Sequence, residues 1–415
     1  MYIKRDIEDK IAKYIHTPEI LAIVGPRQSG KTTLISHIYS NYKEKSNFLT
    51  FEDPETLSMF ERDTLDFINL YVKNKSILFI DEFQYAKNGG KILKRIYDEF
   101  KIKIIITGSS SVDLTVQALK SLVGRIFIFE IFPFNFEEFL RAKDLELCDF
   151  YREYVKKGLE DLLAENSLNF GDEMNNKLRS YFQEYSIYGG YPRVVLSSDT
   201  DEKKEILKGI YSTFFLREVK DYMGLIDDYK LQKLVKSLSL QIGSLIDYKE
   251  LSSLSGYAFV SLKKYLNFLE KTYICSLVRP FFRNKRKEIV KNPKVYFLDA
   301  GLRNYIVNDF RKLDERPDSG ELLENNIFVN LRKKGYEIKY WRSKTKREID
   351  FIVEKDGLTI GIEVKMNVHK CRKSPSETEF SQLYPDSRLI FLYYKGFSRE
   401  VKDPNGFCRF PSYAV

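Results

Sequence analysis

Short, largely apolar runs recur along the first third of the chain, and helix-like stretches separate them. Because these runs do not alternate with polar positions, each is expected to be buried on both faces, as in a parallel sheet covered by helices. The polar residues that follow such strands meet at one edge of the sheet, where ligands bind. The pattern therefore predicts an α/β domain with strands at 21–24, 47–51, 76–80, 102–108 and 126–129.

The middle of the chain has a different pattern. Residues 137–230 show no strand-like runs and are rich in charged segments with helical periodicity, which predicts a helical region. From residue 243 the pattern indicates a helix, a tight turn at Ser255-Gly256, a second helix and two strands around a basic loop. This order is the layout of a winged helix. The expected helices cover 247–254 and 259–269, and the expected strands cover 273–278 and 294–297.

The second helix of this region carries Ser261, Lys263 and Lys264 on its expected polar face. In DNA-binding winged helices such residues contact bases or phosphates. Winged helices also act as protein docking modules and as lids, so a DNA partner and a protein partner both remain open. The densest basic segment of the chain follows this helix and contains Arg279, Arg283, Lys285, Arg286, Lys287, Lys291 and Lys294.

The C-terminal part of the chain reads as a helix followed by strands. The helix is expected over 320–331 and the first strand over 336–341. Two further strands, 347–353 and 358–365, flank Asp356-Gly357, and an Asp-Gly pair between two alternating runs is a strong signal for a β-hairpin.

This hairpin is expected to gather acids and a lysine. Alternation places Glu363 and Lys365 on one face of their strand, and Asp350 lies on the paired strand. With Glu324 on the preceding helix, the acids are expected to hold Mg²⁺, while Lys365 positions or activates water and stabilises phosphate charge. Chance remains an alternative, because a chain that is 31% charged contains many Glu-x-Lys spacings.

The spacing of these four residues resembles the restriction-endonuclease-like fold of the PD-(D/E)xK group. The proline that often precedes the aspartate is absent, and Ile349 stands in its place. The resemblance implies a nuclease-like domain, and both an active nuclease and a DNA-binding relic without catalysis are compatible with it.

The strongest motif in the chain fits the pattern G-x-x-x-x-G-K-[ST] at every fixed position. It follows the strand at 21–24 and opens a helix, so backbone N–H groups and the helix dipole face an anion there. The lysine is expected to reach the β- and γ-phosphates of ATP, and the final threonine to coordinate Mg²⁺. The expected nucleotide-binding residues are Gly25, Pro26, Arg27, Gln28, Ser29, Gly30, Lys31, Thr32 and Thr33.

Two acids follow the strand at 76–80. Asp81 is expected to support Mg²⁺, and Glu82 to orient or deprotonate the water that attacks the γ-phosphate, which indicates an ATP hydrolase. Thr107 and Ser109 are candidate γ-phosphate sensors, with turn capping as the alternative. Arg125 is a candidate arginine finger within its own or a neighbouring subunit, with a structural salt bridge as the alternative.

Charge and composition indicate which partners and which cellular compartment are compatible with this chemistry. The net charge of +9 permits nucleic-acid binding without diagnosing it. The four cysteines lie far apart without a metal-ligand spacing, so free thiols in a reducing compartment are expected. The N-terminus lacks an apolar signal core and no run of about 18 apolar residues occurs, which predicts a cytoplasmic protein without a membrane partner.

Taken together, the motifs resemble those of the prokaryotic AAA+-type ATPases known simply as ATP-binding proteins, whose C-terminal domain belongs to the uncharacterised DUF4143 group. The resemblance implies a P-loop ASCE/AAA+ core and a helical lid, in which Arg217 is a candidate second sensor or a surface residue. It rests on residues 25–32, 51–54, 79–84, 106–110, 124–125, 132–139, 189–192 and 294–302 and on the C-terminal motifs.

The expected organisation is an α/β chain of four parts: a P-loop core at 1–140, a helical lid at 141–235, a winged-helix-like domain at 236–316 and a nuclease-like domain at 317–415. The expected function is ATP hydrolysis coupled to an action on DNA, with ATP and Mg²⁺ as cofactors. A nucleotide-dependent regulatory switch and an assembly protein remain alternatives, and a homo-oligomer is compatible with all three.

Overall fold

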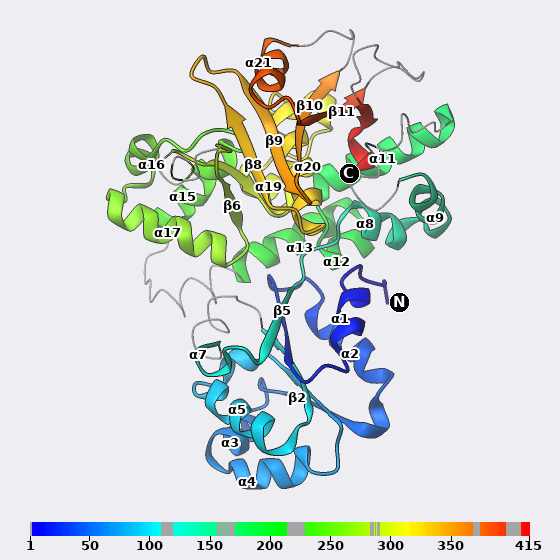
Figure 1. Ribbon diagram of the computed structural model, residues 1–415, viewed down its shortest axis with the longest axis vertical. Coiled ribbons are helices and arrows are strands. Elements are labelled where there is room, and N and C mark those ends of the chain that lie inside the picture. Colours follow the sequence, from blue (N-terminus) through cyan, green and yellow to red (C-terminus); the bar gives the residue numbers. More distant parts are fainter. Residues whose placement is uncertain are drawn as a thin grey trace. The chain divides into compact units, whose positions relative to one another are not determined.

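The computed structural model divides into two compact units (Figure 1). The first unit comprises Met1–Phe134 and Lys271–Tyr273, and the second comprises Asn135–Glu270 and Ile274–Val415. The structure describes residues 2–108, 119–155, 159, 163, 171–213, 229–282, 286, 288, 291–367, 374–395 and 408–415.

The first unit is built on a five-stranded parallel sheet with strand order β2-β3-β4-β1-β5. The predicted α/β architecture is confirmed, because each of the five apolar runs forms one strand. The strands are β1 (Ile20–Val24), β2 (Ser46–Thr50), β3 (Ile77–Asp81), β4 (Lys103–Gly108) and β5 (Ile126–Glu130).

Helices cover both faces of this sheet. One face packs on α1 (Glu8–Tyr14) and α2 (Lys31–Ser40) through Leu21, Ile23 and their neighbours. The opposite face buries Ile20 and Ala22 against the other group of helices. The helices on this face are α3 (Pro54–Arg62), α4 (Thr64–Phe67), α5 (Gly89–Phe100) and α7 (Leu119–Leu122). Three short helical turns complete the unit: η1 (Lys43–Lys45), η2 (Ile68–Val72) and η3 (Phe83–Tyr85).

The second unit begins with a helical region, as the periodicity predicts. Asn135 caps the first of its helices by accepting a hydrogen bond of 2.8 Å from the Glu138 N–H, which fixes where the chain turns into the helix. The helices are α8 (Phe136–Lys143), α9 (Leu145–Tyr154), α11 (Asp172–Tyr188), α12 (Pro192–Leu196), α13 (Thr200–Thr213), α15 (Tyr229–Leu240) and α19 (Ala300–Val307).

Between α15 and α19 the structure contains the predicted helix-turn-helix followed by a hairpin. α16 (Tyr248–Ser255) ends at Gly256, whose φ of 73° reverses the chain before α17 (Phe259–Lys271). The strands β6 (Cys275–Val278) and β7 (Lys294–Phe297) pair in antiparallel fashion.

The C-terminal part is a mixed five-stranded sheet with strand order β12-β11-β10-β9-β8. The predicted turn at Asp356-Gly357 joins β9 and β10, which are antiparallel, while β10 and β11 are parallel. The elements are α20 (Ser319–Lys333), β8 (Ile338–Arg342), β9 (Glu348–Lys355), β10 (Leu358–Asn367), α21 (Pro375–Leu383), β11 (Arg388–Lys395), β12 (Cys408–Pro411), η6 (Leu313–Glu315) and η7 (Ser412–Ala414).

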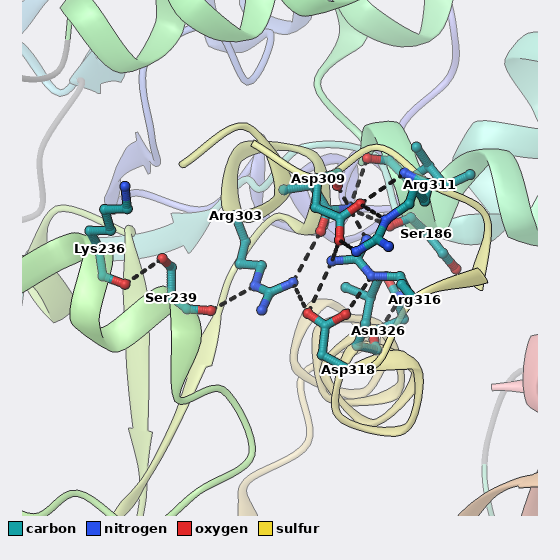
Figure 2. Close-up of polar contacts among 12 residues, drawn as sticks. Ser186, Lys236, Ser239, Arg303, Asp309, Arg311, Arg316, Asp318 and Asn326 are labelled. Carbon is teal, nitrogen blue, oxygen red and sulfur yellow. Dashed lines mark hydrogen bonds and ion pairs between the residues drawn. The ribbon is translucent and has the colours of Figure 1, made fainter. Parts of the chain in front are cut away.

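A network of charges links α19 to the start of α20 (Figure 2). Asp318 accepts contacts of 2.6 Å from both Arg303 and Arg316, whose side chains are buried. Arg316 also lies 3.9 Å from Asp309, which pairs with Arg311 at 2.6 Å. Removal of one partner from such a buried network leaves an uncompensated charge, so the network holds the two helices in one arrangement.

A second tight contact joins the end of α11 to the start of α19. The buried carboxylate of Asp299 accepts hydrogen bonds from the N–H groups of Gly190 at 2.8 Å and Leu302 at 2.9 Å. A Cβ atom on Gly189 would lie 2.2 Å from Asp299 Oδ1, and one on Gly301 would lie 1.9 Å from a backbone oxygen. The chain therefore needs glycine at both positions to bring these helix ends together.

Candidate functional site

The loop between β1 and α2 has the close backbone path that its glycines predict. A Cβ atom on Gly25 would lie 2.0 Å from the carbonyl oxygen of Ile131, so only glycine allows this approach. Gly30 caps α2 with a φ of 94°, and Gln28 also has a positive φ of 60°. The Ser29 hydroxyl is buried and has no hydrogen-bond partner among the described residues. This loop, residues 25–32, is called the phosphate loop below.

The side chain of Lys31 folds back onto the start of the phosphate loop. Its ammonium donates hydrogen bonds to the carbonyl oxygens of Gly25 at 3.1 Å and Pro26 at 2.8 Å, and only 5% of the residue is exposed. Thr32 and Thr33 are exposed in the first turn of α2. The loop thus combines a buried ammonium with a helix N-terminus, and both favour a bound anion.

Arg5 contacts the phosphate loop, and no sequence motif points to it. Its guanidinium is 5% exposed and donates hydrogen bonds to the carbonyl oxygens of Ser29 at 2.8 Å and Phe132 at 2.6 Å. It also stacks over the ring of Phe134 at 4.8 Å. Arg5 therefore ties the N-terminal segment to the phosphate loop and to the chain that follows β5.

Three of the predicted site residues, Asp81, Glu82 and Thr107, come together at the ends of β3 and β4. The buried Thr107 hydroxyl donates to Asp81 and accepts a hydrogen bond of 3.2 Å from the N–H of Glu82. Glu82 has left-handed backbone angles, with φ 53°, and its carboxylate accepts a hydrogen bond from Gln84. Thr107 therefore contacts the carboxylate of Asp81 and the backbone of Glu82, and its role as a γ-phosphate sensor stays a prediction.

Arg125 is not brought to this edge of the sheet. It directly precedes β5, and its carbonyl oxygen accepts the N–H of Ile20 at 2.8 Å, at the start of β1 rather than at its end. At about 3.3 Å per strand residue, this places Arg125 on the order of 15 Å from the phosphate loop. Its side chain pairs with Asp98 at 3.1 Å. Ser109 and Arg217 lie outside the described residues.

The second unit brings together the predicted acidic set. Asp350 of β9 accepts the N–H of Val364 at 2.8 Å, so the hairpin itself orients this carboxylate. Lys365 donates to Glu363, which is 5% exposed and whose second oxygen is buried without a hydrogen-bond partner among the described residues.

Glu324 of α20 faces the same cluster, but it is bound by two side chains that the sequence reasoning did not connect with it. Lys294 of β7 donates to Glu324 at 3.1 Å and also contacts Glu348 at 2.5 Å. The Tyr296 hydroxyl donates to Glu324 as well. Lys294 belongs to the basic segment 279–294, yet it is only 2% exposed. It is therefore not part of a basic surface, and only its ion pairs across 30 or more residues reveal its role.

The electrostatics of this cluster follow from its burial and its like charges. Burial, and then the charge of Glu363, raise the pKa of Asp350 to about 7. Burial, and then the charge of Asp350, raise the pKa of Glu324 to about 7, and burial raises the pKa of Glu363. Burial alone would lower the pKa of Lys365, but Glu363, Asp350 and Glu377 together outweigh it and raise that pKa. Lys365 is therefore an ammonium at neutral pH, which suits it to stabilise negative charge.

The donors of the cluster fit a hard divalent cation in part. Carboxylate oxygens are the ligands that Mg²⁺ and Mn²⁺ prefer, and the unpartnered oxygen of Glu363 faces no competing donor in the described structure. Among the described residues, no three acidic, histidine or cysteine side chains already converge on one point that could hold a metal ion. Glu324 differs from Asp350 and Glu363 because it forms an ion pair with Lys294, so its carboxylate already has a positive partner.

The second helix of the helix-turn-helix presents a mixed surface. Lys263 and Lys264 are exposed as predicted, whereas Ser261 is half-buried. Phe259 and Val260 are 50% and 80% exposed at the start of this helix, and the sequence reasoning did not single them out.

Three family models match successive parts of the chain. Residues 17–140 match an AAA domain, residues 179–313 match the domain of unknown function DUF8612, and residues 319–411 match the domain of unknown function DUF4143. The chain therefore carries an AAA domain followed by a DUF4143 domain, as its motifs suggested, and the segment between them matches a further model that the motifs did not distinguish.

Two relatives match most of this chain, and neither is named for an activity. An uncharacterized protein of Methanocaldococcus jannaschii is 28% identical over 362 residues, which are 85% of this chain and 75% of the relative. An uncharacterized protein of Haemophilus influenzae is 25% identical over 392 residues, which are 89% of each. In the described part of the chain, no helix is long and apolar enough to cross a membrane.

Among solved structures, the Aeropyrum pernix ORC2 protein in its ADP form is similar, with a TM-score of 0.32 and 14% identity over 67% of this chain and 87% of that chain. The AMPPCP-bound DnaA of Aquifex aeolicus gives a TM-score of 0.28 and 15% identity over 64% and 87% of the two chains.

Proposed function

We propose that the first unit binds and hydrolyses ATP at the phosphate loop. Lys31 would contact the β- and γ-phosphates, and Thr32 and Asp81 would hold Mg²⁺, which supplies charge neutralisation when it is bound. Glu82 would orient the attacking water and accept its proton. The observation that carries the proposal is the pair of contacts from Thr107 to Asp81 and Glu82 beside a loop whose buried Ser29 hydroxyl lacks a partner.

This proposal is tested by measuring ATP binding and turnover separately. Lys31→Ala is expected to abolish nucleotide binding, because it removes the buried ammonium. Glu82→Gln is expected to keep binding and to lose turnover, because the amide cannot accept a proton. Turnover by Glu82→Gln at the wild-type rate would contradict the assignment.

We propose further that the second unit acts on nucleic acid as a metal-dependent phosphodiesterase. Asp350 and Glu363 would hold Mg²⁺, which supplies Lewis acidity when it is bound. Lys365 would stabilise negative charge on the phosphate, because its pKa is raised and it stays protonated. The helix-turn-helix would contribute Lys263 and Lys264 to phosphate contacts.

The decisive experiment combines two assays on the full chain, ATP turnover with and without duplex DNA and DNA cleavage with Mg²⁺ or Mn²⁺. Asp350→Ala is expected to lose cleavage and to keep ATP turnover, whereas Lys31→Ala is expected to lose turnover. Equal loss of ATP turnover in both variants would contradict this division of labour.

The DNA contact has its own test. Lys264→Gln is expected to reduce the slope of DNA affinity against salt concentration by about one unit, since one phosphate contact is lost. Lys249→Gln, an exposed lysine on the preceding helix, is the control. DNA affinity of the wild-type chain that does not change with salt would exclude the proposed contacts.

A second function has support from one observation. The exposed Phe259 and Val260 give the second helix an apolar tip, which is typical of a protein-binding surface rather than of base recognition. In that case ATP would control a protein partner, and the C-terminal domain that contains the acidic cluster would bind DNA or protein without cleaving nucleic acid. ATP turnover that is indifferent to DNA, together with loss of a partner complex in Val260→Lys, would favour this function. An arginine finger supplied by Arg125 to a second copy of the chain is compatible with both functions.

A further inference from the structure

The hairpin after the helix-turn-helix reaches into the acidic cluster and is fixed there. Asn325 of α20 accepts the N–H of Phe297 at 2.8 Å and donates to the carbonyl oxygen of the same residue at 3.1 Å. These two hydrogen bonds hold β7 against α20 immediately beside Glu324. Lys294 and Tyr296 alternate to the same face of β7, and both bind Glu324.

We infer that Lys294 is a permanent cation of the acidic site, whose ammonium occupies the position beside Glu324 that a second divalent ion would otherwise take. The inference deepens the proposed phosphodiesterase and rests on Asp350 and Glu363 as its metal ligands. In this inference, Glu324 is the ion-pair partner of Lys294 and not a metal ligand.

The surroundings of Lys294 support a fixed charge rather than a mobile one. The side chain is 3% exposed, and it lies between Glu324 at 3.1 Å and Glu348 at 2.5 Å. Burial alone would lower its pKa, but the charges of Glu324, Asp350 and Glu348 outweigh burial and raise it. The ring of Tyr340, 5.8 Å from the ammonium, adds a further favourable contact.

The charge of Lys294 limits how many divalent metal ions the site can bind. A divalent cation placed beside Glu324 would face the buried ammonium at close range, and the repulsion is poorly screened there. Asp350 and Glu363 lie on the hairpin strands; among the described residues, no lysine or arginine pairs with Asp350, and Lys365 pairs with Glu363. The site therefore admits one divalent ion, and Lys294 supplies the remaining positive charge.

The experiment counts Mn²⁺ ions bound to the full chain without nucleotide, by electron paramagnetic resonance of free Mn²⁺ at pH 7.5. Lys294→Met is expected to bind one more Mn²⁺ per chain than the wild type, and Glu324→Gln in the same variant is expected to remove it. Lys291→Met, a change of an exposed lysine in the same segment, is the matched control and is expected to bind the wild-type number. Equal numbers for Lys294→Met and the wild type would overturn the inference.

A second measurement does not depend on folding of the Lys294 variant. In the otherwise wild-type chain, Glu324→Gln is expected to leave the number of bound Mn²⁺ ions unchanged, and a lower number would overturn the inference because Glu324 would then be a ligand. Failure of the proposed phosphodiesterase has a different signature, since Asp350→Asn would then bind as much Mn²⁺ as the wild type.

Discussion

Arg5 donates a hydrogen bond of 2.8 Å to the carbonyl oxygen of Ser29 and so anchors the phosphate loop to the N-terminal segment. Arg5→Met is expected to weaken nucleotide binding by about 10- to 100-fold, because a hydrogen bond from a charged group contributes about 1.5–3 kcal/mol. Equilibrium titration with a fluorescent ATP analogue measures this loss. Lys4→Met is the control, since Lys4 is exposed and pairs only weakly at the surface with Asp9. Equal affinities in the two variants would show that Arg5 does not position the loop.

Gly25→Ala tests the close approach of the loop to the chain after β5. The added methyl group would lie 2.0 Å from the Ile131 carbonyl oxygen, so either the loop or that segment must move. We expect loss of nucleotide binding and a decrease of about 1–3 kcal/mol in the free energy of unfolding of the first unit, as for other overpacked sites. Gly209→Ala, in α13 with nothing within 4 Å of its added Cβ, should leave binding unchanged and is the control. Chemical denaturation and ATP titration provide the two measurements.

Thr107→Val tests the link between the two acids. The change keeps the shape of the side chain and removes the hydroxyl that contacts Asp81 and Glu82. We expect kcat for ATP hydrolysis to fall roughly 10- to 100-fold with little change in KM, because the hydroxyl contacts Asp81 and Glu82, which the proposal assigns to the chemical step, and not the phosphate loop. Thr107→Ser keeps the hydroxyl and should retain most of the turnover. If the valine and serine variants have the same kcat, Thr107 has no role in hydrolysis.

The raised pKa of Asp350 predicts a pH-dependent cost in stability. Its carboxyl has a pKa of about 7 in the folded protein and about 3.9 when unfolded, so the folded state binds more protons between these values. The free energy of unfolding therefore falls as the pH rises from about 4 to 7. Asp350→Asn removes this cost, and the variant is expected to be about 1–3 kcal/mol more stable than the wild type at pH 8 and similar to it at pH 4.

Chemical denaturation in the presence of a metal chelator at both pH values tests this expectation. Asp356→Asn, a change in the exposed hairpin turn, is the matched control and should follow the wild type at both pH values. A constant difference between Asp350→Asn and the wild type at pH 4 and pH 8 would mean that this carboxyl does not titrate as proposed.

The structural elements were predictable wherever the signal is local. The apolar runs became β1 to β5, but only β1, β3 and β4 are buried throughout; β2 is mostly half-buried, and the edge strand β5 is partly exposed at Phe127 and Ile128, which the expectation of burial on both faces missed. Asp356-Gly357 formed a hairpin turn because both residues adopt positive φ there, 50° and 82°. The placement of the phosphate loop between β1 and α2 and of Asp81 and Glu82 at the end of β3 was predictable for the same reason, since adjacent residues set it, whereas their chemistry stays a prediction.

The contacts that complete each site were not predictable, because they join distant parts of the chain. Arg5 reaches Phe132 across 127 residues, and Lys294 reaches Glu324 across 30 residues. Arg5 stands in no motif, and Lys294, although it opens the matched stretch 294–302, belongs to a basic segment whose other described lysine and arginine residues are exposed. Only the folded arrangement distinguishes a buried counter-ion from a surface charge.

The contact between Asp299 and the two glycine-bearing segments also sets a rule for recombining this protein with its relatives. The ends of α11 and α19 fit together without space for a single extra carbon atom at Gly189 or Gly301. A chimera that takes one of these segments from a relative with a larger residue would separate the helix ends and expose the Asp299 carboxylate. Crossover points for such hybrids therefore belong outside residues 189–301, so that both halves of the contact come from the same parent.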